Sequence, residues 1–127
     1  MSGALDEATW IVQGDEPLVS THARADDVVP YGTGQITFLG IFQLMFVDGS
    51  ATIDQRCQTL GINSCLYTHE GASVAHVPHA GSAPYLDTTM VVLRNFLSEI
   101  ICGTPSTNCA YSVGVRDPRP SFEVNVI

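Results

Sequence analysis

The sequence predicts a mainly β fold, an antiparallel sheet forming a sandwich or small barrel, with one α-helix in the C-terminal half. Short apolar segments bounded by Gly, Pro, Asn and Asp recur along the chain, which is typical of antiparallel strands joined by turns. One segment, 109–115, alternates between apolar and small or polar residues, as a half-buried strand does. A helical stripe occurs at about residues 88–102. An α+β arrangement is the alternative that the same pattern allows.

The first quarter of the chain predicts a strand, a turn and a returning strand. Residues 8–13 form a short strand, and a Gly-Asp-Glu-Pro turn follows at 14–17. Residues 18–21 are then expected to return as the partner strand. A loop rich in Asp, Pro and Gly covers 22–34.

The most apolar stretch, residues 35–47, is predicted to be a long strand with a bulge at Gly40. Asp48-Gly49 follows directly, and Asp-Gly between apolar segments favours a tight hairpin turn because both turn positions require a positive φ. The chain is therefore expected to return as a strand over 50–54. A buried helix over 35–47 is the other interpretation, because periodicity does not distinguish the two in a short apolar run.

The second half of the chain contains the predicted helix. Its apolar residues recur at three- and four-residue spacing and form one stripe: Met90, Leu93, Phe96, Leu97, Ile100 and Ile101. Asp87 can cap its start, Gly103 suits the position after its end, and Pro105 prevents its continuation. Short strands are expected at 66–69, 72–77, 109–115 and 122–126, with loops at 57–65 and 78–84.

Size and composition indicate a single domain spanning residues 1–127. The chain shows no internal repeat, linker or low-complexity tract, and its length suffices for one buried core. The longest apolar stretch is much shorter than the ~20 residues of a membrane helix. The first residues lack the basic and apolar regions of a signal peptide. A soluble protein is therefore expected; its location is unknown, and a virion or an extracellular assembly would suit it.

The charge balance argues against nucleic acids and membranes as direct partners. The net charge is −8, with no lysine and five scattered arginines, whereas phosphate binding depends mainly on Lys and Arg. Charged residues make up 14% of the chain, well below the usual ~25%. Interface cores are depleted in Lys, Glu and Asp, so this composition favours a homo-oligomer built from copies of the same chain.

The four cysteines form two close pairs, Cys57 with Cys65 and Cys102 with Cys109. Neither pair has the Cys-x-x-Cys spacing of a structural zinc site. Local disulfides would close two short loops, each stabilising the fold by ~2–3 kcal/mol, and pairing between subunits would lock an assembly. Alternatively, all four are reduced and pack as small apolar residues. Cys65 and His69 form a nucleophile and its base only if folding brings them together.

Three of the four histidines lie close together in the sequence and suggest a divalent metal site. His69, His76 and His79, with Glu70, supply the imidazole and carboxylate ligands that zinc, iron or nickel accepts. Their spacing matches no compact motif such as His-Glu-x-x-His, and Pro78 favours a loop. A set of surface histidines on a polar loop is the alternative. No other cofactor is indicated.

A candidate acid–base group surrounds Asp26 and Asp27. His22 and Tyr31 are near them in the sequence, so these side chains are candidates for proton transfer in a pocket. Adjacent carboxylates on an acidic loop are more often solvated, and nothing in the sequence shows burial that would shift a pKa.

Two functional hypotheses follow, with a third behind them. The first is a self-assembling structural protein, a coat, shell, decoration or filament subunit acting through homo-oligomeric β-rich interfaces. The second is a small β-barrel or α+β cone enzyme, a cyclase, isomerase or metal-dependent enzyme with an apolar pocket. Its chemistry would come from the histidine-rich loop, or from Asp26 and His22 as acid and base. The third is a secreted, disulfide-stapled binding module.

Overall fold

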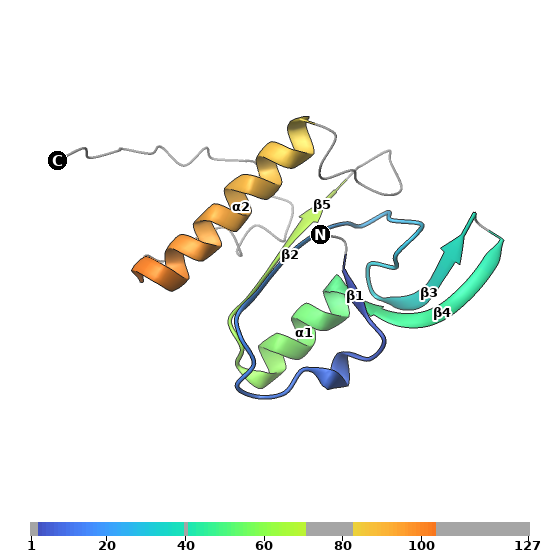
Figure 1. The fold of residues 1–127 in the computed structure, drawn as a ribbon, viewed down its shortest axis with the longest axis horizontal. Coiled ribbons are helices and arrows are strands. Elements are labelled where there is room, and N and C mark those ends of the chain that lie inside the picture. The colour runs from blue at the N-terminus through green and yellow to red at the C-terminus, as the bar shows by residue number, and fades with distance from the viewer. Residues whose placement is uncertain (1–2, 40, 71–82, 104–127) are drawn as a thin grey trace.

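The described chain is an α+β fold with two small sheets and two α-helices (Figure 1). This computed structural model describes residues 3–39, 41–70 and 83–103. The elements in chain order are β1 (Ala4–Leu5), the 3-10 helix η1 (Ala8–Trp10), β2 (Leu18–Ala23), β3 (Thr33–Phe38), β4 (Phe42–Gly49), α1 (Ser50–Leu60), β5 (Ser64–His69) and α2 (Ala83–Cys102). The α+β alternative fits this arrangement, and the described strands do not close into a barrel.

The strands divide between the two sheets. β1, β4 and β3 form an antiparallel sheet in that order, and β2 pairs in parallel with β5. The parallel register is continuous from Leu18 opposite Ser64 to Ala23 opposite His69. In Figure 1 the β2–β5 pair lies between α1 and α2, and the β3–β4 hairpin projects away from both helices.

Apolar clusters lie on the two sides of the parallel pair. The cluster beside α1 contains Ile11, Ile53, Cys57 and Ile62, and the cluster beside α2 contains Cys65, Val92 and Phe96. β5 and the second half of β2 are largely buried, as expected for parallel strands covered by helices on both faces. The two helices therefore provide most of the apolar burial of the described fold.

Helix α1 is defined by its C-terminal signal. Gly61 adopts the left-handed conformation with φ 71°, and its N–H donates to the carbonyl of Gln58. The N–H of Ile62 donates to the carbonyl of Cys57 at 2.9 Å. This pair of bonds is a Schellman motif, which satisfies the last helical carbonyls. Ile62 then packs in the same cluster as Cys57.

Gly49 joins β4 to α1 where another segment of chain crosses the junction. Its N–H donates to the carbonyl of Gly32 at 2.9 Å. A Cβ at this position would meet the carbonyl oxygens of Pro30, Tyr31 and Gly32, the last two at 2.7 and 2.8 Å. Since the φ of −79° suits any residue, close approach of backbone, rather than conformation, requires glycine here.

The predicted hairpin turn at Asp48-Gly49 is wrong. The chain reverses earlier, between β3 and β4, where Leu39 has a positive φ of 55°. The stretch 35–47 therefore contains parts of two strands rather than one. After Gly49 the chain enters α1, so the expected strand over 50–54 is also wrong. The Asp-Gly pair marks a close backbone contact and a helix start instead of a turn.

The predicted helix at 88–102 is confirmed, although it begins five residues earlier. Asp87 consequently lies inside α2 rather than at its cap. Gly103 follows the helix with φ 66°, and its N–H donates to the carbonyl of Glu99. The C-terminal signal was therefore interpreted correctly.

Two further strands are confirmed and one is not. Strands β2 and β5 include the predicted segments 18–21 and 66–69 and extend beyond both. Residues 8–10 form η1 rather than part of a strand, and α1 extends into the loop that was predicted from residue 57. The strands predicted at 72–77, 109–115 and 122–126, the bulge at Gly40 and most of the loop at 78–84 lie outside the described residues.

Candidate functional site

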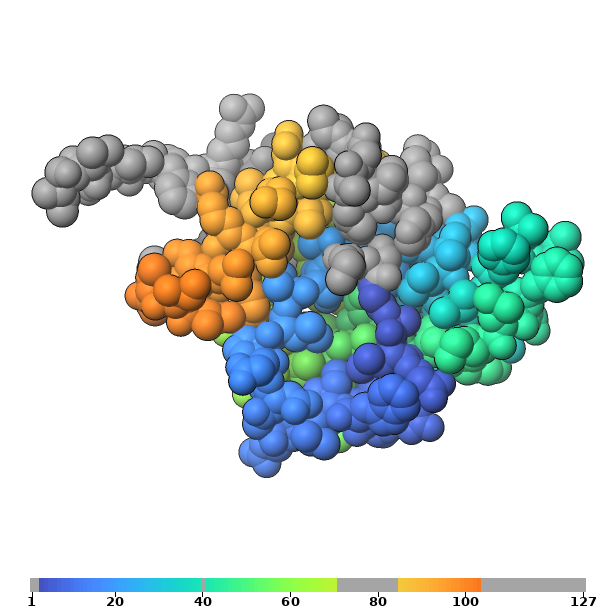
Figure 2. Space-filling view, viewed as in Figure 1, coloured from blue at the N-terminus to red at the C-terminus, as the bar shows by residue number. Residues whose placement is uncertain are grey.

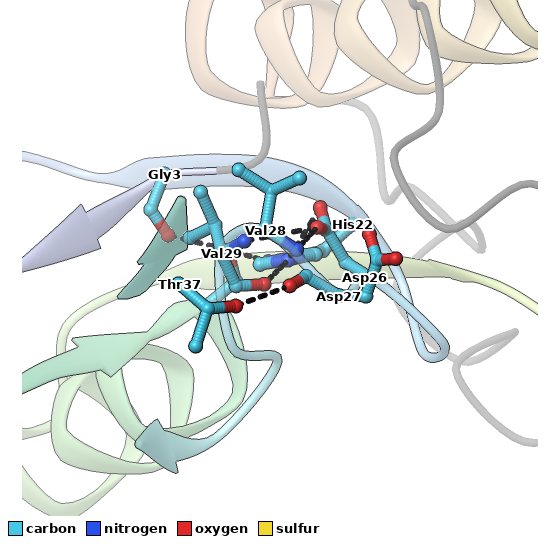
Figure 3. Close-up of polar contacts among 8 residues, drawn as sticks. Gly3, His22, Asp26, Asp27, Val28, Val29 and Thr37 are labelled. Atoms are coloured by element: carbon cyan, nitrogen blue, oxygen red, sulfur yellow. Dashed lines mark hydrogen bonds and ion pairs between the residues drawn. The ribbon is translucent and has the colours of Figure 1, made fainter. Parts of the chain in front are cut away.

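The candidate site is a buried polar cluster centred on His22, which lies on β2 and is 0% exposed. Its Nδ1 is 2.8 Å from Ser50 Oγ, at the start of α1. Its Nε2 is 3.1 Å from the carbonyl oxygen of Val29 and 3.4 Å from Asp26 Oδ2. Figure 3 shows the imidazole held among the loop that follows β2, with Gly3 nearby. The ring thus joins β2 to the loop that follows it and to the start of α1.

A turn fixes the orientation of Asp26 toward His22. Asp26 Oδ1 accepts hydrogen bonds from the N–H groups of Val28 and Val29, each at 2.9 Å. A carboxylate that bonds the backbone two and three residues ahead is an Asx turn. The other oxygen, Oδ2, then faces the imidazole, and the Asp26 side chain is 0% exposed.

The hydrogen bonds of the His22 ring and of the Ser50 hydroxyl depend on which of their atoms carry a proton. His22 Nε2 faces two acceptors, the Val29 carbonyl and Asp26, so it carries a proton. Ser50 Oγ is within hydrogen-bond distance of both His22 Nδ1 and the Gly3 carbonyl, at 2.8 and 3.2 Å, but its hydroxyl has one proton to donate. Both Ser50 contacts are hydrogen bonds only when Nδ1 is also protonated. The ring therefore links Ser50 on one side to the Val29 carbonyl and Asp26 on the other.

A second group of side chains lies beside His22. The Tyr31 ring lies edge-on to the imidazole at 5.5 Å, and its hydroxyl is 2.6 Å from Thr68 Oγ1. The Arg24 guanidinium lies 4.9 Å from the centre of the Tyr31 ring. Arg24 also pairs with Glu70 at 2.7 Å, and this hydrogen bond raises the pKa of Arg24. These contacts join β2 and its loop to the end of β5.

The predicted acid–base residues are thus partly brought together. His22, Asp26 and Tyr31 are in one cluster, whereas Asp27 is exposed and contributes its backbone carbonyl to Thr37 Oγ1 at 2.9 Å. The interpretation of both carboxylates as solvated is wrong for Asp26, because the Asx turn and His22 bury it. It agrees with the exposed Asp27.

Ser50 is a residue of this site that the sequence did not reveal. It lies 28 residues from His22 and begins a helix that was expected to be a strand. The order Ser50, His22, Asp26 resembles that of a nucleophile, a base and an orienting acid. The N–H groups on either side of Ser50, however, already donate to loop carbonyls at 2.9 Å, so neither is available for an oxyanion. The described geometry supports a buried polar network more than a nucleophile.

The predicted metal ligands are only partly described. His69 is buried at the end of β5, edge-on to two tyrosine rings, and Glu70 is paired with Arg24. His76 and His79 lie outside the described residues. Among residues 3–39, 41–70 and 83–103, no three His, Cys, Asp or Glu side chains gather as metal ligands. The four-residue metal site stays a prediction.

Two of the cysteines are free thiols, Cys57 and Cys102, so neither of the two short-loop disulfides is formed. Cys57 lies on α1, and Cys65, on β5, packs beside α2 and is disulfide-bonded. Cys109 lies outside the described residues. Cys65 and His69 are four residues apart on one strand, which separates their backbones by about 13 Å. The suggested nucleophile–base pair is therefore wrong.

The surface of the β3–β4 hairpin, called the arm below, is unusually apolar. Seven large apolar side chains on it are between 47% and 78% exposed: Phe38, Leu39, Ile41, Phe42, Leu44, Met45 and Phe46. Successive strand residues point to opposite faces, so consecutive exposed residues in β4 make both faces apolar. The sequence has no charged residue from Thr33 to Val47.

The arm is attached at Asp48 to the rest of the described fold. This carboxylate accepts a hydrogen bond from Thr33 Oγ1 at 2.6 Å and one from the Ala8 N–H at 2.7 Å. These two bonds lower the pKa of Asp48, the one from Thr33 most. β1 pairs with β4 only at Asp48 and Gly49. Among the described strands, therefore, none covers this edge of β4 from Phe42 to Val47.

A cavity of about 580 Å³ lies between the N-terminal segment, β2, α1 and α2. Its lining is mostly apolar, with side chains that include Leu5, Ile11, Leu18, Ile53 and Leu93. Ser50 lines it as well, so the buried polar cluster borders the cavity. Figure 2 shows green atoms of α1 in the hollow between the blue N-terminal segments.

Comparison with known proteins adds no assignment to this geometry. No protein-family model, no curated protein and no solved structure matches the chain. Within the part of the chain that the structure describes, neither helix is long and apolar enough to cross a membrane.

Proposed function

We propose that this chain is a subunit of a self-assembling structural protein and that its copies associate through the arm. The observation that carries the proposal is the exposure of large apolar side chains on both faces of a two-stranded hairpin. A two-stranded hairpin in water is marginally stable by itself. Monomeric proteins seldom expose apolar patches of this kind, and an uncovered one is typical of an interaction site.

The strand edges support a second copy as the partner. Natural proteins protect exposed edges with lysine, proline or inward-pointing charges, and the arm has no charged side chain between Thr33 and Val47 to do so. Two β4 edges can pair antiparallel about a two-fold axis, because such an interface uses the same surface of both copies. Pairing of a β4 edge with the outer edge of β3 would instead continue into a filament or shell.

The chemistry of the arm makes an anionic surface a poor partner. The arm contains no basic residue, and the chain carries a net charge of −8. Nucleic acids and anionic membranes attract proteins through Lys and Arg. An apolar, uncharged surface suits an equally uncharged apolar surface, which a second arm provides.

The proposal predicts that the solution mass depends on the arm. Light scattering on a sizing column should show wild-type protein as a dimer or larger particle, well above the chain mass of 13.6 kDa. Leu44→Lys/Phe46→Lys should elute as a monomer, with association weakened by about 100-fold or more, because two charges would be buried unpaired in the interface. Added lysines also reduce the net negative charge, so general repulsion between chains would not explain the loss of assembly.

A matched control is available on α2. Ile101 is exposed to the same degree as the arm residues, and Ile101→Lys should assemble like the wild type. Wild-type protein that remains monomeric at about 100 µM would contradict the proposal. So would a double variant that retains the wild-type particle mass.

A further inference from the structure

We propose that the cavity beside Ser50 binds a small, neutral, predominantly apolar molecule, a function separate from assembly through the arm. The volume of about 580 Å³ lies within the range of ligand pockets, ~300–1,000 Å³. Protein interiors are close-packed and contain few voids larger than a water molecule. An apolar space of this size between two helices is therefore suited to an occupant.

The lining determines the charge of that occupant. Asp15 and Glu16 are the acidic side chains at the cavity, and the described lining residues include no arginine or histidine. The Cys57 thiol also lines it, and burial, helped by Asp54 and Asp15, raises the pKa of this thiol. An anionic ligand would meet only acidic or neutral groups. A neutral molecule avoids that repulsion and buries its apolar surface against Leu18 and Ile53.

Ser50 is where the buried cluster reaches the cavity wall, although its side chain is 1% exposed. Its Oγ is held by His22 at 2.8 Å and by the Gly3 carbonyl at 3.2 Å. A hydroxyl oxygen has two lone pairs, so it retains acceptor capacity when His22 donates to it. A ligand with one weak donor group among apolar rings or chains matches this lining.

The test uses a pair of dyes that differ in charge. N-phenylnaphthylamine is neutral, apolar and has one N–H, and anilinonaphthalene sulfonate adds an anionic group to the same ring system. Titration of the full chain should give saturable fluorescence of the neutral dye with one site per chain and a Kd near ~10 µM. The sulfonated dye should bind at least ~10-fold more weakly at low salt, because like charges repel.

Two variants of α2 locate the site. Leu93 lines the cavity, and Leu93→Trp should weaken binding of the neutral dye at least ~10-fold by filling the space. Leu97 lies on the same helix with an exposed side chain, and Leu97→Trp should bind as the wild type does. The arm variant Leu44→Lys/Phe46→Lys should also bind normally. This result separates the cavity from the apolar arm and keeps the ligand proposal independent of assembly.

The two free cysteines provide a readout that requires no substitution. Cys57 lines the cavity and Cys102 is exposed. Neutral N-ethylmaleimide, applied at a mildly alkaline pH because of the raised pKa of Cys57, should modify Cys102 first and Cys57 slowly. Saturating neutral dye should slow modification of Cys57 at least ~10-fold and leave Cys102 unchanged, as measured by peptide mass spectrometry.

Three results would overturn the proposal. One is the absence of saturable binding of the neutral dye to the full chain. Another is binding that disappears in the arm variant, which would place the dye on the hairpin. The third is unchanged modification of Cys57 in the presence of bound dye, whether or not Leu93→Trp folds.

Discussion

Gly49→Ala should unfold the protein or destabilise it by at least about 4 kcal/mol, an exceptional effect for one methyl group. The added Cβ would overlap the carbonyl oxygen of Pro30 and approach those of Tyr31 and Gly32. All three obstacles are backbone atoms, so no side-chain rotation relieves the contact. The crossing segment would have to move away, and the hydrogen bonds from Gly49 and Ala51 to its carbonyls would be lost.

Urea denaturation followed by far-ultraviolet circular dichroism measures this effect. Because the proposed association would make apparent stability depend on concentration, the comparison should use the Leu44→Lys/Phe46→Lys background. Gly32→Ala is the control, since the nearest atom to its added Cβ is 4.0 Å away, and it should change stability by less than about 0.5 kcal/mol. Equal midpoints for the two glycine variants would show that the junction tolerates a Cβ.

Asp26→Ala should destabilise the fold by about 2–4 kcal/mol, because it removes one partner from a buried polar network. His22 would lose its carboxylate contact while remaining fully buried. The N–H groups of Val28 and Val29 would lose their acceptor, Asp26 Oδ1, and an unsatisfied buried donor costs about 1–3 kcal/mol.

The neighbouring residue provides the control for this substitution. Asp27 is exposed, and its described hydrogen bond uses the backbone carbonyl, so Asp27→Ala should change stability by about 0.5 kcal/mol or less. Each variant loses one carboxyl group, so the net charge of the protein changes equally in both. A difference between their stabilities therefore reflects the contacts of Asp26. If urea midpoints shift equally in the two variants, the cluster around His22 does not stabilise the fold.

The parts of the fold that were predictable are those with a strong local signal. Helix α2 combines an apolar stripe with a glycine directly after its end, and both features were interpreted correctly. Strands β2 and β5 are short segments next to turn residues, and their existence followed from that local pattern. Their parallel pairing did not, because no local pattern relates Leu18 to Ser64.

Helix α1 was missed because the Asp-Gly pair that is typical of a hairpin turn also contains the glycine that a close backbone contact requires. Asp48-Gly49 indicated a hairpin, whereas Gly49 is required by the crossing segment near Gly32. The helix itself carried evidence in the spacing of Ile53, Cys57 and Leu60, followed by Gly61. The actual hairpin reverses next to Leu39, a residue that rarely adopts a positive φ.

The candidate site was predictable only for those residues that lie close together in the sequence. His22, Asp26 and Tyr31 are close in the sequence, so their association required only a loop that folds back on β2. Ser50 joins them through the long-range arrangement of β4 and α1. The exposure of the arm was also hidden, because an apolar stretch in a sequence is expected to be buried, and only the structure shows Phe42 and Leu44 facing solvent.

The pairing of β2 with β5 determines the order in which the molecule can form. The arm is a local hairpin, and hairpins close in about 1–10 µs. The β2–β5 pair spans the whole arm and α1, and such non-local pairings form more slowly because a long loop must close first. On a ribosome, the arm emerges before β5 has been synthesised. Its apolar edges are therefore exposed before β2 and β5 have paired, and if copies associate through the arm as proposed, association would compete with folding from the start.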